Sequence, residues 1–490
     1  MLKPLPSSQW NRSTAAHLLN RAGFGGTPAQ IEALAKLGLE GAVDRLIRWE
    51  DQAESFPPPE WTKVDPETRA ETFRKFRNGT PEERQAAQRE MMKERRQHLL
   101  ELQGWWLHRM FTTPRPLQEK LTLFWHGHFA TAIEKVRDPI LMWRQNETLR
   151  HHAGGDWLTL LDEVTRDPAM LIYLDQHQSR PQNPNENYAR ELLELFALGE
   201  GHYTEQDVME AARALTGLTL DRLKLRAEYD LNRHDTRRKT FMGNTGNLDG
   251  WDILDTVAHH PQSARFISAK LWAYFAAENP SPDWIDALSH TFVSSERKVQ
   301  PFLRAIFLSE EFYSPGVLRR QIKSPVQFLV QACRQLEREL PPTPLAMNAL
   351  RLLGQVLFAP PNVKGWDGGV AWINTNTLLH RHNLALLLVT GENALPIADR
   401  GKRALPKRAG RSRHRLVKGV VETERLIPLE DRRDAERVVS RIEDRLMATH
   451  FRVQDRTALL DHARTQAPLD DAEAATLLRL AMCTADYQLC

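Results

Sequence analysis

Cysteine is scarce in this chain of 490 residues. The three cysteines, Cys333, Cys483 and Cys490, are too few and too widely spaced for a disulfide framework or a thiolate metal site. Long apolar runs are also missing. The longest one, LALLLV at 384–389, is far shorter than the roughly 20 residues of a membrane-spanning helix. The sequence therefore predicts neither a disulfide scaffold nor a membrane span.

Neither sign of charge dominates, since 66 Lys and Arg face 63 Asp and Glu for a formal net charge of +3. Such a balance gives no reason to expect nucleic acid as a partner. The opening MLKPLPSSQW lacks the apolar segment of a secretory signal, so the default expectation is a cytoplasmic protein. Residues 400–418 are a local exception, with nine Lys or Arg and no aromatic residue for stacking on bases. We predict that this stretch is an exposed, mobile insertion.

A capping residue followed by proline recurs along the chain. Proline suits the first helical turn, where its missing N–H would have no intrahelical partner. The pairs are Thr27-Pro28, Thr80-Pro81, Asp167-Pro168, Asn183-Pro184 and Ser324-Pro325. Between them apolar residues follow helical spacing, and no convincing alternation of apolar and polar residues marks strands. The predicted fold is mainly α, a large multi-helix globular body with long functional loops and little or no β-sheet.

Composition changes along the chain leave two descriptions of its organisation open. The whole of 1–490 can be one helical unit. It can also be divided into a part with a long charged helix (1–115), a central part with the candidate site (116–395), the basic insertion (396–420) and C-terminal helices (421–490).

The stretch FWHGHFATAIEKV at 124–136 holds two histidines, His126 and His128. Two histidines one residue apart can chelate one ion from a strand, but on a helix they point about 200° apart. The surrounding apolar residues follow a helical stripe that places His128 toward the core and His126 away from it. Both metal ligation and simple core packing remain open for this segment.

A second candidate is NPNENYARELLELFALG, read as a helix that starts at Pro184. Tyr188, Leu192, Leu195 and Phe196 then form an apolar face. The polar face carries Asn187, Arg190, Glu191 and Glu194. Glu191 and Glu194 are neighbours on the helix surface, so they could bridge a metal or divide acid and base roles, or simply face solvent beside Arg190.

Two loops supply further candidates. His234 and Asp235 lie in a loop rich in Gly and Asn, where Asp235 could orient the imidazole or bind a metal itself. PPNVKGWDGG at 360–369 offers Lys364 and Asp367, with tryptophans that suit a pocket wall or a structural wedge. The chain contains no His-Glu-x-x-His, no Glu-x-x-His pair, no phosphate-binding glycine loop and no nucleophile elbow.

Taken together, these segments resemble the bacterial family called domain of unknown function 1800. The matching stretches are AAHLLNRAGFGGTPAQIEAL, PRPLQEKLTLFWHGHFAT, RDPAMLIYLD, NENYARELLELFALG, YTEQDVMEAARALTG, the RHD loop, HHPQSARFISAKLW, KSPVQFLV and PPNVKGWDGG. The resemblance runs from about residue 10 to the final ADYQLC. Leu218, where members often have Trp, and the basic insertion depart from the pattern.

The resemblance implies a context but no mechanism. Members are commonly encoded beside a second family, domain of unknown function 1501, which resembles the alkaline phosphatase and sulfatase superfamily and often carries twin-arginine export signals. A chain without its own signal could stay in the cytoplasm or be exported folded, bound to such a partner.

The sequence thus supports two main hypotheses. The first is a hydrolase acting on an anionic substrate, with a divalent metal held by His126, His128, His234 and Asp235. A Glu, Glu191 or Glu194, would act as the base, and Arg190 and Lys364 would hold the anion, beside Asp367. The second is a non-catalytic binding or maturation partner of a sulfatase-like domain of unknown function 1501 protein. An oxidative di-metal enzyme is less favoured, because the Glu-x-x-His pairs are missing.

Overall fold

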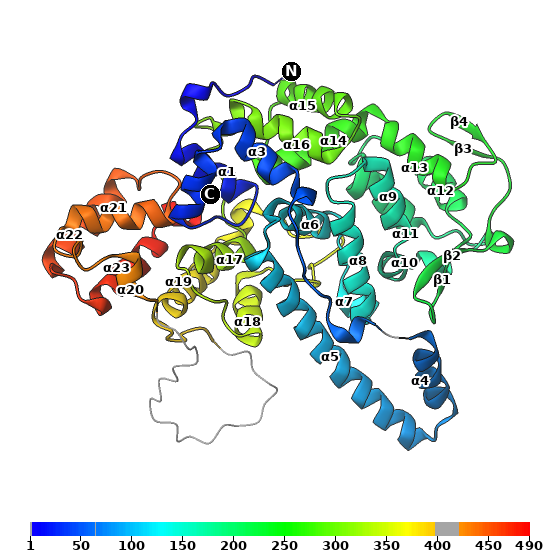
Figure 1. The fold of residues 1–490 in the computed structure, drawn as a ribbon. Coiled ribbons are helices and arrows are strands. Elements are labelled where there is room, and N and C mark those ends of the chain that lie inside the picture. The colour runs from blue at the N-terminus through cyan, green and yellow to red at the C-terminus, as the bar shows by residue number, and fades with distance from the viewer. Residues whose placement is uncertain (1, 64, 397–420) are drawn as a thin grey trace.

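The computed structural model describes residues 2–63, 65–396 and 421–490, and the basic stretch at 400–418 lies outside them. The mainly α prediction is confirmed (Figure 1). Within the described ranges the strands form two antiparallel hairpins. These are β1 (Leu218–Asp221) with β2 (Arg226–Tyr229), and β3 (Lys239–Phe241) with β4 (Asn244–Gly246). Every helix in these ranges is too short or too polar to cross a lipid bilayer.

The N-terminal helices pack into the body, and a long helical arm follows them. The three N-terminal helices are α1 (Arg12–Arg21), α2 (Pro28–Ala35) and α3 (Gly38–Ile47). The arm consists of α4 (Pro66–Asn78) and α5 (Pro81–Thr112), and its far end extends away from the other helices (Figure 1). The inner end of α5 returns to the body, where Trp106 and Met110 are fully buried.

The central helices follow α6 (Pro116–His128), which carries both histidines of the 124–136 stretch. They are α7 (Ile133–Val136), α8 (Pro139–His151), α9 (Trp157–Thr165), α10 (Pro168–Tyr173), α11 (Glu186–Glu191), α12 (Glu205–Ala214), α13 (Gly250–His259), α14 (Pro261–Phe275), α15 (Pro282–Ser294) and α16 (Val299–Leu308). The C-terminal helices are α17 (Pro325–Gln335), α18 (Thr343–Leu353), α19 (Thr375–Thr390), α20 (Thr423–Leu426), α21 (Ala435–Leu446), α22 (Val453–Gln466) and α23 (Asp471–Cys483).

Two hydrophobic clusters form the core, and α6 contributes to both. Leu121 and Trp125 of α6 pack in the cluster that includes α1, α9, α14 and α16. Leu123 of the same helix packs in the cluster that includes α5, α17, α19 and α23. Helix α6 therefore lies at the junction of the two clusters, and its remaining face is free to line a cavity.

Most of the predicted helix starts are confirmed. Thr27, Thr80, Asp167 and Ser324 each accept a hydrogen bond from the backbone N–H three residues later. The start predicted at Asn183-Pro184 is wrong. Asn183 instead pairs with Arg180 in a tight bridge, and α11 begins at Glu186 with Asn185 as its cap.

Helix α11 continues into a π-helical turn, Leu192–Ala197, which the sequence analysis did not predict. The wider turn shifts the register of the side chains by about one position. Leu193 is therefore fully buried, whereas Leu195, predicted on the apolar face, is only half-buried. This turn also leaves the carbonyl groups of Leu195 and Phe196 near the end of the helix, where side chains from other elements bind them.

Candidate functional site

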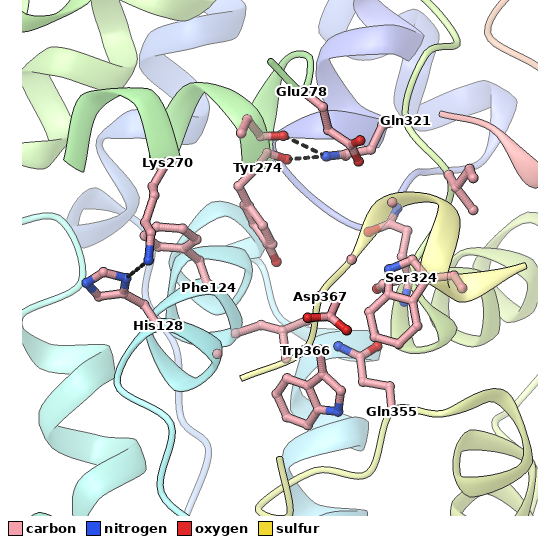
Figure 2. A pocket seen from close by; sticks show the side chains of 18 of the residues that line it. Phe124, His128, Lys270, Tyr274, Glu278, Gln321, Ser324, Gln355, Trp366 and Asp367 are labelled. Carbon is pink, nitrogen blue, oxygen red and sulfur yellow. Dashed lines mark hydrogen bonds between the residues drawn. The ribbon is translucent and has the colours of Figure 1, made fainter. Parts of the chain in front are cut away.

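A cavity of about 300 Å³ lies beside α6, at the junction of the two core clusters (Figure 2). One face of α6 lines it at helical spacing, through Lys120, Leu123, Phe124, Gly127 and His128. Helix α14 adds Lys270, Ala273 and Tyr274, and the start of α17 adds Ser324 and Gln327. The loop between α18 and α19, residues 354–374, closes the opposite side with Lys364, Trp366 and Asp367.

Glycine allows this loop to dock directly on α6. A Cβ on Gly365, whose φ is +82°, would collide with the carbonyl oxygen of Gly127. The ring of Trp366 packs over Gly127 and lies 5.7 Å from the ring of His126. Gly127, between the two histidines, and Gly365 of the PPNVKGWDGG loop are therefore parts of one contact.

His126 anchors the loop, and its predicted outward orientation is wrong. The loop covers that face of α6, so His126 is 1% exposed. Its Nε2 accepts a hydrogen bond of 3.0 Å from the backbone N–H of Phe358. Burial lowers the pKa of His126 to about 3. His126 is therefore a neutral structural acceptor at neutral pH.

His128 and Lys270 form the central pair of the cavity. His128 is buried, as predicted, and its Nε2–H donates to the Phe196 carbonyl oxygen at 2.9 Å. Its Nδ1 lies 3.4 Å from Nζ of Lys270, which also donates to the Leu195 carbonyl oxygen at 3.1 Å. The carbonyl groups of Leu195 and Phe196 both belong to the end of the π-helical turn.

Burial sets the protonation of this pair. It lowers the pKa of Lys270 to about 8. Burial, and then the adjacent Lys270, hold the pKa of His128 well below its ordinary value. In the part of the chain that the structure describes, Lys270 makes no ion pair with a carboxylate. At neutral pH the cavity therefore contains a neutral imidazole and an amine that loses its proton readily.

The polar face of α11 lies apart from the cavity lining. Arg190 is engaged on the surface by both carboxylate oxygens of Glu205, at 2.7 and 2.8 Å, and by Glu186. Glu194 accepts a hydrogen bond from Tyr203. Burial, and then Glu194, raise the pKa of Glu191, whereas Arg190 and Lys364 lower it. Glu191 is thus outside the cavity lining, and its electrostatic interaction with Lys364 is what connects it to the rim.

His234 and Asp235 have structural partners near the β1–β2 hairpin. The imidazole of His234 lies beside the Tyr229 ring, and its Nδ1 hydrogen-bonds the Thr216 carbonyl oxygen at 2.9 Å. The buried Asp235 carboxylate accepts from Arg213 and Arg237. The hydrogen bonds from Arg237, followed by those from Arg213, lower the pKa of Asp235. The buried Asp235 carboxylate is therefore committed to ion pairs with two arginines that extend toward the surface.

The four hypothesised metal ligands, His126, His128, His234 and Asp235, are not brought together. His126 and His128 leave α6 on different sides, and their ring neighbours differ. Over residues 2–63, 65–396 and 421–490, no three His, Cys, Asp or Glu side chains are grouped so that they could hold a metal ion. The residues that the sequence analysis assigned to a metal do not fit one.

Besides His128, two further predicted residues, Lys364 and Asp367, line the cavity, at its exposed rim. Glu278, just beyond α14, lies at the same rim against Gly369, where a Cβ would collide with its carboxylate. The rim therefore carries both signs of charge, whereas the buried interior carries amines.

Sequence reasoning missed the interior amines, Lys120 and Lys270. The signal was present for Lys120, which precedes Phe124 and His128 by four and eight residues and so shares their stripe on α6. Lys270 lies in ARFISAKLWAYF, one turn after Phe266 and one turn before Tyr274. A lysine inside such an aromatic stripe is the pattern that would have indicated a buried amine.

Comparison with known protein families identifies the class of protein. The family model described as Protein of unknown function (DUF1800) matches residues 17–489, which is nearly the whole chain. The chain therefore belongs to the DUF1800 family. The cavity residues Lys120, His128, Lys270 and Lys364 all lie within the matched region. No curated protein and no solved structure matches the chain.

Proposed function

We propose that this protein is a hydrolase that acts on a small anionic substrate in the cavity, with Lys270 as the general base. The observation that carries the proposal is the environment of the Lys270 amine. It faces a cavity of about 300 Å³, has a pKa lowered to about 8, and is held by two acceptors. A base whose pKa lies near the working pH is well suited to proton transfer.

The two acceptors orient the base. A neutral amine has two N–H groups and one lone pair. The Leu195 carbonyl oxygen and Nδ1 of His128 take the two N–H groups, which leaves the lone pair for the cavity. The Phe196 carbonyl oxygen binds Nε2–H of His128 and so fixes the tautomer whose Nδ1 can accept. In this proposal Lys270 replaces the Glu base and the metal of the sequence hypothesis.

Hydrolysis then needs one water molecule and no further reactant. Lys270 takes a proton from the water molecule, and the water oxygen forms a bond to the electrophilic atom of the substrate. The bond to the leaving group breaks, and the Lys270 ammonium returns the proton to that group. Lys364 at the rim supplies positive charge for an anionic substrate.

The test compares Lys270→Met with Lys93→Met, a matched change of an exposed lysine on the arm helix α5. Both variants and the parent are assayed on phosphate, sulfate and carboxylate esters from pH 6 to pH 10. The parent should hydrolyse at least one class, with a rate that rises with a midpoint around pH 8 and levels off at higher pH. Lys270→Met should lower kcat by roughly 10²–10⁴-fold, and Lys93→Met should leave it unchanged.

A parent that hydrolyses none of these esters faster than Lys270→Met contradicts the proposal. That result would favour the alternative, a non-catalytic partner of a sulfatase-like domain of unknown function 1501 protein. Such a role predicts that Lys270→Met binds that partner as tightly as the parent does.

A further inference from the structure

Lys120 is a buried amine at the inner end of the cavity. Its side chain is 5% exposed, and its Nζ donates to Oε1 of Gln327. The rings of Phe24 and Tyr274 flank the ammonium group, with centroids 5.2 and 5.6 Å from Nζ. Lys120 is also one of the residues that line the cavity. The amine is therefore removed from bulk water but borders the space where a ligand would bind.

A second buried cation lies behind it. The Arg21 guanidinium donates to the carbonyl oxygens of Phe275 and Ala276, at 2.8 and 2.7 Å, and lies 3.3 Å from Sγ of Cys490. Neither Arg21 nor Lys120 makes an ion pair with an Asp or Glu in the described ranges of the chain. Buried charges are normally paired, because removing a lone charge from water is costly. No Asp or Glu carboxylate within the described ranges therefore pairs with either cation at this end of the cavity.

Burial dominates the protonation of Lys120. It lowers the pKa of Lys120 to about 7, against an opposing influence of Cys490, and Arg21 adds a smaller lowering. About half of the Lys120 amines would thus be neutral at pH 7. A bound anion would favour the charged form, because an opposite charge nearby raises the pKa of an amine.

The two interior amines mark two ends of the cavity. Lys120, Phe124 and His128 follow one another at intervals of four along α6, so Lys120 and His128 are separated by about 12 Å along the helix axis. Lys270 binds at the His128 end. The aromatic side chains of Phe124, Tyr274 and Trp366 line the space between the ends. A small molecule that filled the cavity would meet an amine at each end.

We infer that Lys120 forms an anion subsite, which binds a carboxylate, phosphate or sulfate group of the substrate while the bond to be cleaved lies at Lys270. This inference deepens the proposed function by naming the part of the substrate that is held at the inner end. Gln327 positions the Lys120 amine through Oε1, while its own N–H₂ group donates to the Asn20 carbonyl oxygen and to Oε1 of Gln331. The Phe124, Tyr274 and Trp366 walls suit an apolar or planar connection between the two ends.

Anion binding at Lys120 predicts uptake of a proton. The other titratable groups that line the cavity are His128, Lys270, Tyr274 and Cys490 inside, and Glu278, Lys364 and Asp367 at the rim. Arg21 adjoins Lys120 from behind, beside Cys490. Of the two amines with lowered pKa values, Lys120 changes charge at the lower pH, so near pH 7 it is the main group able to take up a proton. Lys270→Met removes the contribution of the other amine.

The test is calorimetric titration of the full chain with inorganic sulfate at pH 7, in two buffers that differ in ionisation enthalpy. Sulfate carries no titrating proton at this pH, so any proton taken up comes from the buffer and binds to the protein. The parent and Lys270→Met should bind sulfate with uptake approaching about half a proton per site. Repeating the titration with acetate and inorganic phosphate shows which of the oxyanions the subsite prefers.

Two variants at Lys120 separate the subsite from the rest of the cavity. Lys120→Arg keeps a charge that does not titrate, so it should bind sulfate without proton uptake. Lys120→Met should weaken sulfate binding at least tenfold, with thermal unfolding recorded to confirm that it is folded. Undiminished binding in Lys120→Met, or no sulfate binding by the parent, overturns the inference. Because the titration needs no turnover, its result is independent of whether Lys270 is the base.

Discussion

Gly365 lies against the carbonyl oxygen of Gly127, so closely that no side chain could stand at position 365. This contact joins the 354–374 loop to α6 and places Trp366 and Asp367 on the cavity. The two glycines are not equivalent, however. A Cβ on Gly127 would lie 3.7 Å from the Trp366 ring, which is an ordinary van der Waals distance.

The first prediction uses this difference between two Gly→Ala changes. Gly365→Ala should lower the free energy of unfolding by at least about 1–3 kcal/mol, because its positive φ alone strains any other residue. Gly127→Ala should be neutral or stabilising by up to about 1 kcal/mol, since alanine is the better helix former. Urea unfolding of both variants measures the two effects. Equal losses in both would show that the loop does not dock as described.

The second prediction concerns acid stability and His126. The pKa of His126 is about 3 in the folded protein, compared with about 6.5 in an unfolded chain. Between these values only the unfolded state takes up the proton, so stability is complete above pH 6.5 and falls as the pH decreases. One such histidine contributes up to about 1.4 kcal/mol per pH unit.

His126→Leu tests this dependence directly. The variant should be less stable than the parent at pH 7, by about 1–3 kcal/mol, because the Phe358 N–H loses its acceptor. Its stability should also fall less steeply than that of the parent between pH 6.5 and pH 4. Thermal unfolding at several pH values gives both quantities. Parallel curves for parent and variant would mean that His126 is not buried in its neutral form.

A third prediction separates two aspartates that the sequence analysis assigned to one site. Asp235→Asn should destabilise the fold by about 3 kcal/mol, since it leaves Arg213 and Arg237 without their buried partner. Asp367→Asn, at an exposed position, should change stability by less than about 0.5 kcal/mol. Thermal midpoints at pH 7 compare the two. A stable Asp235→Asn would reopen a functional role for Asp235.

A fourth prediction concerns Arg190, which the sequence analysis placed among the anion-binding residues. Arg190 pairs with Glu205 and Glu186 on the surface. Arg190→Gln should therefore cost less than about 1 kcal/mol of stability and leave sulfate binding to the cavity unchanged. Sulfate titration of this variant beside the parent is the measurement. A tenfold weaker affinity would place Arg190 in the anion site after all.

The helical fold could be predicted from the sequence because the signals that mark a helix lie within the helix itself. Cap residues such as Thr80 and Ser324 act within a single turn, and apolar spacing reports on one helix at a time. The π-helical turn at 192–197 was not predictable in this way. It is stabilised in part by His128 and Lys270, which bind its carbonyl groups from two other helices.

The candidate site was predicted only in part for the same reason. His128, Lys364 and Asp367 were identified from their own segments, and the fold places all three on the cavity. The outward orientation of His126 was wrong because a loop more than 220 residues away in sequence covers it. Lys270 was missed because the burial that lowers its pKa depends on the tertiary structure.

The most direct test of the central claim is the pKa of Lys270 itself, measured by competitive labelling of lysines with acetic anhydride across a pH range. Mass spectrometry of the resulting peptides gives the pH dependence of the labelling of each lysine separately. We predict that labelling of Lys270 rises with a midpoint around pH 8, well below the ordinary lysine pKa of about 10.4. A labelling midpoint for Lys270 near that ordinary value would contradict the account, because an ordinary surface amine could not act as the base at neutral pH.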